Sequence, residues 1–273
     1  MSRRESVPRK ITSLSHPLVK IARSLAGARG RRKHGLVLVE GMRAVEGAVA
    51  AGVTPRAAFM TREAAATRRG EALVLSLSRA GCAVNEVPAS VFRSISQVET
   101  PQGAAIMCPV KAFQLEDALK LNFVLVADGL QDPGNLGTII RSAAAFGVEA
   151  VLLTKGTVDV RNPKVLRASA GIWLGVPVCE SLDPDALGKS LASAGFRIIV
   201  ADSGDGIDFR RENYHGRLAL VVGSEPHGPG DILGRRANSR VRIPIRVGVE
   251  SLNVAAAAAI LLAQAAWRRS AGG

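Results

Sequence analysis

Short apolar runs alternate along most of the chain with segments whose apolar residues recur every three to four positions. The runs are typical of buried strands, and the wider spacing is typical of amphipathic helices. The first series spans residues 35–110 and predicts a small α/β domain. Its predicted strands are 36–39, 57–60, 82–87 and 103–110, and its predicted helices are 42–51, 71–80 and 89–95.

A second series begins after a mixed polar segment, 111–121, which we interpret as a linker. Its strands are nearly continuous Val, Ile and Leu runs, which indicates a sheet covered on both faces and therefore mostly parallel. We predict a second α/β domain over residues 122–273. Its predicted strands are 123–127, 150–154, 176–179, 197–201, 218–222 and 241–245, and its predicted helices are 135–146, 163–174, 184–194, 229–237 and 254–266.

The N-terminal region is strongly basic. The formal net charge is +13, and residues 1–34 hold ten Lys or Arg residues against one Glu. Such a segment indicates contact with a polyanion, most plausibly nucleic acid. We predict a basic arm over 1–34, with a short helix at 17–26 and a cationic loop at 27–35. A solvated arm that is ordered only on RNA is equally compatible with this composition.

Composition and spacing argue against several other classes. The apolar run 254–267 is too short for a membrane span of about 20 residues, and no apolar segment follows the basic start as in a signal peptide. Cys82, Cys108 and Cys179 are far apart, which favours a reducing cytoplasm over a disulfide framework or zinc site. The four histidines are dispersed, so we predict no metal. No phosphate-binding, dinucleotide or serine-hydrolase motif is present.

Three polar, glycine-containing loops follow predicted strands of the second domain, at 128–141, 222–230 and 243–253. Open parallel sheets bind ligands beyond the carboxyl ends of their strands. The third loop also leads into a helix, whose first backbone N–H groups are free to bind a polar ligand. Ser251 is either part of such a site or a helix cap. The three loops together predict one ligand site.

The residues of these loops carry a specific resemblance. D-P-G-N-L-G-T-I-I-R-S-A at 132–143, G-S-E-P-H-G at 223–228 and I-P-I-R-V-G-V-E-S-L-N-V-A-A-A at 243–257 resemble the three motifs of the SpoU (TrmH-type) RNA ribose 2′-O-methyltransferases of the SPOUT superfamily. N-P-K-V-L-R-A-S-A-G at 162–171 and L-V-L-V-E-G-M-R-A-V-E at 36–46 are also similar to that family.

The resemblance covers about residues 30–267, with Ser224 where Asn is common and Pro226 where small residues are common. It implies a homodimer with a C-terminal trefoil knot, S-adenosylmethionine as cofactor, and an RNA-binding role for the small domain. The implied cofactor-binding residues are Val222, Gly223, Ser224, Ile243, Ile245, Ser251 and Leu252. The implied catalytic residues are Arg141, Asn135, Glu225, Ser251 and Asn253. The predicted RNA-binding residues are Arg29, Arg31, Arg32, Lys33 and Arg141.

The implied reaction transfers a methyl group from a sulfonium to a ribose 2′-hydroxyl. An arginine is protonated at neutral pH and is no base, so Arg141 would clamp the target phosphate and stabilise developing charge. The phosphate or Glu225 takes the proton, whereas Asn135 and Asn253 would mainly fix the loops. A non-catalytic ribosome-assembly factor and a base methyltransferase stay open as alternatives. Ribosomal RNA is favoured over transfer RNA because of the added N-terminal domain.

Overall fold

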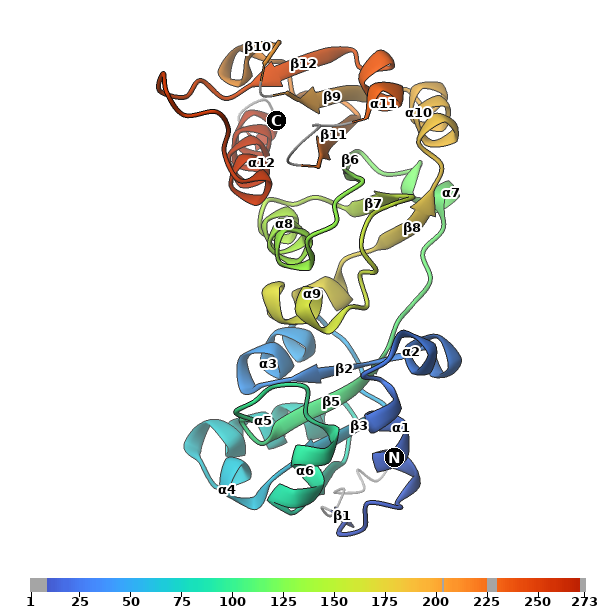
Figure 1. Ribbon diagram of the computed structural model, residues 1–273, viewed down its shortest axis with the longest axis vertical. Helices are drawn as coiled ribbons and strands as arrows, with labels where there is room; N and C mark the ends of the chain where they lie inside the picture. The colour runs from blue at the N-terminus through green and yellow to red at the C-terminus, as the bar shows by residue number, and fades with distance from the viewer. Residues whose placement is uncertain (1–8, 203, 225–229, 271–273) are drawn as a thin grey trace. The chain divides into compact units, whose positions relative to one another are not determined.

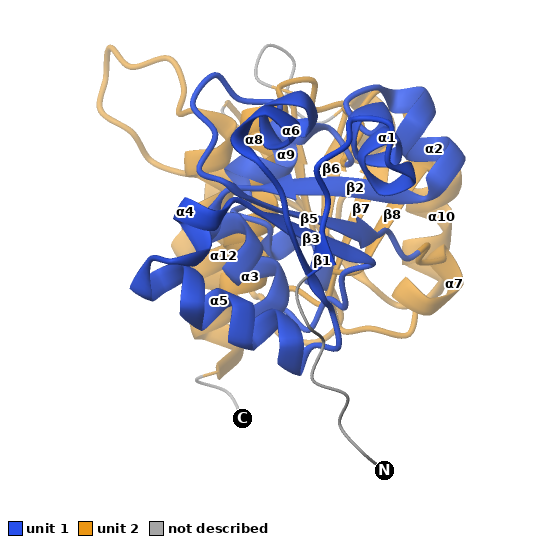
Figure 2. Cartoon of the chain, turned by 90° about the horizontal axis from the view of Figure 1, so that it is seen from below, with its two compact units in different colours: residues 1–111, 161–175 blue, residues 112–160, 176–273 orange. Residues whose placement is uncertain are grey.

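The computed structural model describes residues 9–202, 204–224 and 230–270. It divides into two compact units (Figure 2). Unit 1 comprises residues 1–111 and 161–175, and unit 2 comprises residues 112–160 and 176–273. These boundaries differ from the predicted ones at three places. The basic N-terminal segment and residues 161–175 both belong to unit 1, and residues 112–121 of the predicted linker belong to unit 2.

Unit 1 is built on a mixed sheet in the order β1-β4-β3-β5-β2 (Figure 1). β5 is antiparallel to β2 and β3, whereas β1, β4 and β3 run parallel. Alternate strand residues face opposite sides, and one side packs on α1 and α6 around buried Phe59 and Phe92. The strands are β1 (Arg9–Lys10), β2 (Leu36–Glu40), β3 (Ala57–Met60), β4 (Val84–Glu86) and β5 (Ala104–Pro109). The helices in the first 111 residues are α1 (Pro17–Ser24), α2 (Ala28–His34), α3 (Met42–Ala50), α4 (Arg62–Ala65), α5 (Arg68–Arg79) and α6 (Ala89–Ile95).

The described part of the basic segment is an integral part of unit 1, which corrects its interpretation as an arm. β1 pairs with β4, and Val19, Ala22 and Leu25 are completely buried in the core. The predicted cationic loop is the helix α2, which ends at Gly35 in the left-handed conformation that glycine adopts without strain. Residues 1–8 of the predicted arm lie outside the described residues.

Residues 161–175 pack against α3, inside unit 1. They form α9 (Pro163–Ala168) and the 3₁₀ helix η1 (Ile172–Gly175). A methyl group on Gly47 of α3 would lie 2.3 Å from the Ala170 carbonyl oxygen, and one on Gly171 would lie 2.2 Å from the Ala44 carbonyl oxygen. The backbones therefore approach closely only because both positions are glycine, a constraint that strand and helix periodicity does not reveal.

Unit 2 is built on a sheet in the order β10-β12-β9-β11-β6-β7-β8, in which neighbouring strands are parallel. α8 and α12 cover one face, and α7, α10 and α11 cover the other (Figure 1). The predicted mostly parallel sheet is confirmed. The strands are β6 (Phe123–Asp128), β7 (Ala150–Thr154), β8 (Val178–Leu182), β9 (Arg197–Ala201), β10 (Ile207–Asp208), β11 (Leu218–Gly223) and β12 (Ser239–Arg242). The helices are α7 (Leu115–Ala118), α8 (Pro133–Ala145), α10 (Pro184–Ser193), η2 (Phe209–Arg211), α11 (Asp231–Arg235) and α12 (Val254–Ser270).

The three cysteines are buried free thiols. Burial raises the pKa of Cys82 and of Cys179 to about 11, and that of Cys108 to about 12. These thiols are therefore protonated at neutral pH. Across the described ranges, we find no helix with the length and apolar character needed to cross a membrane.

Candidate functional site

A cavity lies in unit 2 at the carboxyl ends of β9, β11 and β12, where α12 begins. Its volume is about 100 Å³, and it opens to solvent. The position is the one that parallel sheets use for ligands. The lining residues are Ala201, Asp202, Val222, Gly223, Ser224, Val241, Ile243, Ile245, Ser251, Leu252, Val254, Ala257 and Leu261.

The lining is apolar on its walls and polar at its ends. Val222, Val241 and Leu261 are almost completely buried, whereas Ser224, Ser251 and Asp202 supply polar groups. Because the lining includes Gly223, a ligand can approach the backbone of β11 closely. The cavity therefore suits a ligand with a flat apolar body and polar edges.

Two asparagines join the first and third loops. Asn253 Nδ2 donates a hydrogen bond to Asn135 Oδ1 over 3.0 Å. Asn253 Oδ1 accepts hydrogen bonds from the backbone N–H groups of Ala255 and Ala256, so Asn253 caps α12. The alternative that Ser251 is the helix cap is therefore wrong, because the helix begins later, at Val254.

A buried carboxylate fixes the chain that follows the second loop. Asp128, at the end of β6, is 8% exposed. Its Oδ2 accepts a hydrogen bond from the backbone N–H of Gly230 over 2.8 Å, and its Oδ1 accepts one from the Thr154 hydroxyl over 2.6 Å. β6 is thus linked at its carboxyl end to β7 and to the start of α11. The sequence analysis did not assign a role to Asp128, although a carboxylate directly after a buried strand is a usable signal.

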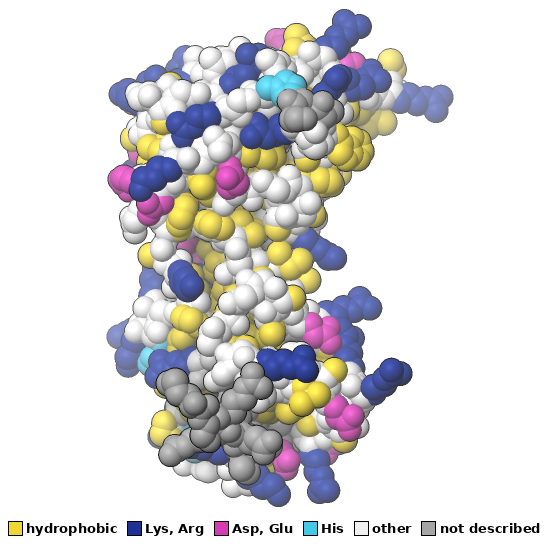
Figure 3. Space-filling model, turned by 180° about the vertical axis from the view of Figure 1, so that it is seen from behind, with side chains coloured by type: hydrophobic (Ala, Val, Ile, Leu, Met, Phe, Trp, Pro, Cys, Tyr) yellow, Lys and Arg dark blue, Asp and Glu magenta, His cyan; other side chains and the backbone are white. Residues whose placement is uncertain are grey.

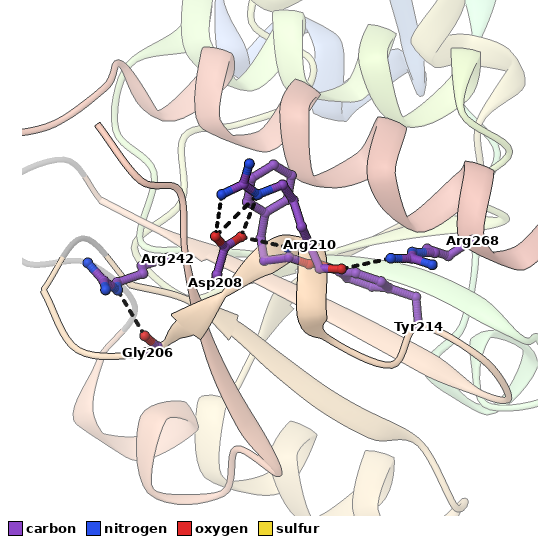
Figure 4. Close-up of polar contacts among 7 residues, drawn as sticks. Gly206, Asp208, Arg210, Tyr214, Arg242 and Arg268 are labelled. Atoms are coloured by element: carbon purple, nitrogen blue, oxygen red, sulfur yellow. Dashed lines mark hydrogen bonds and ion pairs between the residues drawn. The ribbon is translucent and has the colours of Figure 1, made fainter. Parts of the chain in front are cut away.

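The loop after β9 is held on β12 by arginines. Arg240 Nη1 donates to Asp202 over 2.7 Å. Arg242 Nε donates to the Gly206 carbonyl oxygen over 3.1 Å, as Figure 4 shows. Further along the same edge, the Arg210 guanidinium pairs with Asp208 and holds the pKa of that carboxyl at about 2. These contacts fix the short strand β10, which the sequence analysis missed.

The structure places the predicted cofactor-binding residues together, since all of them line the cavity: Val222, Gly223, Ser224, Ile243, Ile245, Ser251 and Leu252. Arg141 lies elsewhere. It is an exposed residue of α8 outside the cavity lining, and its side chain makes no hydrogen bond or ion pair with the rest of the described chain. Glu225 lies outside the described residues.

The predicted RNA-binding residues divide into two groups. Arg29, Arg32 and Lys33 of α2 are exposed. Arg31 is 6% exposed, and its guanidinium donates to the carbonyl oxygens of Leu25 and Ala26, just after α1. The RNA-binding prediction for Arg31 is therefore wrong, because its donors are directed to the protein backbone.

Lys and Arg side chains recur over the face drawn in Figure 3, in both units. The distribution agrees with the predicted polyanion contact. Among the residues that the structure describes, no group of three or more His, Cys, Asp or Glu side chains is arranged to hold a metal ion.

Comparison with known proteins defines the class. The model of the SpoU rRNA Methylase family matches residues 122–263, and the MRM3-like substrate binding domain matches residues 16–105. The chain belongs to the SpoU rRNA Methylase family, which confirms the resemblance and the predicted pairing of a methyltransferase domain with a preceding substrate-binding domain. The substrate-binding match begins within the basic segment, as the fold of unit 1 requires.

Individual relatives cover nearly the whole chain. The Bacillus subtilis 23S rRNA (guanosine(2553)-2′-O)-methyltransferase RlmP is 31% identical over 254 residues, which are 93% of this chain and 98% of that protein. The mouse mitochondrial rRNA methyltransferase 3 is 32% identical over 85% of this chain and 67% of its own length. The crystal structure of an AdoMet-bound rRNA methyltransferase from Sinorhizobium meliloti has a TM-score of 0.79 at 27% identity, covering 94% of this chain and 97% of that chain.

Proposed function

We propose that this protein is an S-adenosylmethionine-dependent RNA 2′-O-ribose methyltransferase that acts on ribosomal RNA in the cytoplasm. The observation that carries the proposal is the unit 2 cavity, which gathers residues of the second and third motif loops. The Asn135–Asn253 hydrogen bond joins the first loop to the third. RlmP, an rRNA 2′-O-methyltransferase by name, aligns with this chain over 98% of its own length.

The cavity fits the cofactor by its chemistry. Its apolar walls, including Val222 and Leu261, suit adenine and the aliphatic carbons of the methionine moiety. The backbone at Gly223 and Leu252 offers hydrogen bonds to the polar edge of the base. When bound, S-adenosylmethionine supplies a methyl group already activated on a positively charged sulfur.

Methyl transfer also requires side chains that bind and orient the RNA. Arg141 is exposed on α8, six residues after Asn135. A guanidinium forms bidentate hydrogen bonds with a phosphate and stays charged at all relevant pH values. Arg141 therefore holds the phosphate of the target nucleotide and stabilises negative charge on the 2′-oxygen as its proton leaves to the phosphate or to Glu225.

Transfer of a labelled methyl group from S-adenosylmethionine to ribosomal RNA tests the proposal, with nucleoside analysis to locate the label on the ribose. Arg141→Ala should lower the turnover rate by about 10²–10³-fold, the cost of losing one charge-stabilising donor, and should leave cofactor affinity unchanged. Arg235→Ala, which removes an exposed arginine of α11, is the matched control. A near wild-type rate for Arg141→Ala contradicts the role assigned to Arg141. Lack of cofactor affinity in the wild type contradicts the activity itself.

The active form is a homodimer in this proposal, and the C-terminal part of unit 2 forms a trefoil knot. Exposed apolar residues on α12 support the dimer: Ile260 is 38% exposed and Trp267, two turns later on the same face, is 66% exposed. Packing of α12 beside α8 supports the knotted arrangement, because it returns the chain end to the first motif.

A further inference from the structure

A fourth loop, outside the three motif loops, reaches the cavity. Asp202 directly follows β9, which lies between β11 and β12 in the sheet. Ala201, the last residue of β9, pairs with Val241 of β12. The strand order therefore places Asp202 between the strand ends that carry the second and third motifs. Among the described lining residues, it supplies the charged side chain.

The carboxylate of Asp202 already has protein partners. Oδ1 accepts a hydrogen bond from the Gly204 backbone N–H over 2.9 Å, and Oδ2 accepts one from Arg240 over 2.7 Å. Burial opposes ionisation of this carboxyl, but these hydrogen bonds outweigh burial and lower the pKa of Asp202 below its ordinary value. Asp202 is therefore an ionised acceptor at neutral pH.

The pairing with Arg240 decides which ligand group suits this acceptor. Because Arg240 neutralises the carboxylate, a second cation gains little there. A carboxylate accepts roughly four hydrogen bonds, so acceptor capacity is left for an uncharged donor such as a hydroxyl. The Arg242 bond to Gly206 fixes the same loop on β12, which holds the acceptor in place before a ligand arrives.

We propose that the carboxylate of Asp202 binds the ribose hydroxyls of S-adenosylmethionine. The inference rests on the proposed function and names a specificity residue of its cofactor site. Carboxylates after strands of open parallel sheets bind ribose hydroxyls in dinucleotide sites, and the same chemistry applies here on a different strand. The apolar walls take the adenine, and Asp202 accepts from the sugar between the base and the amino-acid end.

Calorimetry on the full-length protein tests this assignment without turnover. The probes are S-adenosylhomocysteine and its 2′-deoxy and 3′-deoxy forms. The wild type should bind at least one deoxy form about tenfold or more weakly, the effect of removing a hydrogen bond to a charged group. Asp202→Ala should bind the parent probe more weakly and should lose the discrimination against that deoxy form.

Two further variants separate recognition from folding. Asp202→Asn keeps the shape and one acceptor oxygen, so it should retain part of the discrimination. Arg240→Gln removes the partner of Asp202 but keeps the carboxylate, so it should discriminate as the wild type does. Thermal unfolding of each variant verifies that it is folded.

Equal discrimination by the wild type and Asp202→Ala overturns the proposal. So does an Asp202→Ala defect that disappears with 5′-methylthioadenosine, which keeps both ribose hydroxyls but lacks the amino acid, because the carboxylate would then face the ammonium group. Absence of wild-type affinity for S-adenosylhomocysteine contradicts the proposed function instead, so the two failures are distinct.

Discussion

Asn253 performs two tasks that different substitutions separate. Its Oδ1 caps α12, and its Nδ2 donates to Asn135 across the first and third loops. Loss of a helix cap costs about 1 kcal/mol, and loss of a hydrogen bond costs about 0.5–1.5 kcal/mol. Since Asn253 is exposed, we expect Asn253→Ala to destabilise unit 2 by about 1–2 kcal/mol.

Asn253→Asp keeps the cap, because aspartate is as good an N-cap as asparagine and its charge is favourable at a helix N-terminus. It removes the donor to Asn135. We therefore expect Asn253→Asp to lose about half as much stability as Asn253→Ala. Asn135→Ala, which leaves the α12 cap intact, should behave like Asn253→Asp.

Denaturant unfolding monitored together with amide hydrogen exchange in α12 provides the measurement, because exchange reports on this helix separately from unit 1. Cofactor affinity should fall with Asn253→Ala, since Ser251 and Leu252 line the cavity immediately before the cap. Equal destabilisation by the Ala and Asp variants would refute the assignment of separate roles to Oδ1, which caps α12, and Nδ2, which donates to Asn135. Unchanged exchange in α12 after Asn253→Ala would refute the capping role.

Three other predictions concern the surface and the thiols. Trp267→Glu combined with Ile260→Glu should convert the proposed dimer to a monomer in light scattering, whereas Leu75→Glu, at an exposed apolar residue of unit 1, should not. A monomeric wild type contradicts the proposed dimer. Arg32→Ala should weaken RNA binding and reduce its salt dependence by about one released counterion. Arg31→Ala should instead lower the free energy of unfolding. Equal effects of the two variants on RNA affinity would show that Arg31 contacts RNA after all. The folded-state pKa of Cys108 is raised to about 12, so its stabilising contribution is complete below its unfolded pKa of about 8.5 and is lost as pH rises through the folded value. Cys108→Ala should therefore reduce the fall in the free energy of unfolding between pH 8 and 11. An unchanged dependence of that free energy on pH contradicts burial of the thiol.

The long, regular elements were predictable because their patterns are local. β7 and β9 have the predicted bounds, and α3, α6 and α10 differ from prediction by at most one residue at their ends. The start of α8 and the end of α12 differ from prediction. α8 begins at Pro133 because the Asp132 side chain caps it, and α12 continues to Ser270.

Non-local features escaped the sequence analysis. β10 is two residues long and exists because Ile207 and Asp208 pair with β12. Arg31 was predicted to be a surface cation, but its guanidinium donates to the carbonyl oxygens of Leu25 and Ala26, just after α1. Asp202 was passed over because the strand order that brings β9 between β11 and β12 is not written in any short segment.

The assignment of residues 161–175 to unit 1 bears on how the protein is made. Trp173, Val165 and Leu166 are buried there, yet the ribosome synthesises β6 and β7 of unit 2 before them. At about 5–20 residues per second, the last helices of unit 1 are synthesised several seconds after residues 1–111. By then, part of unit 2 has already emerged from the ribosome. Neither unit is a contiguous gene segment, so exchange of whole modules between relatives requires three cuts in the coding sequence rather than one.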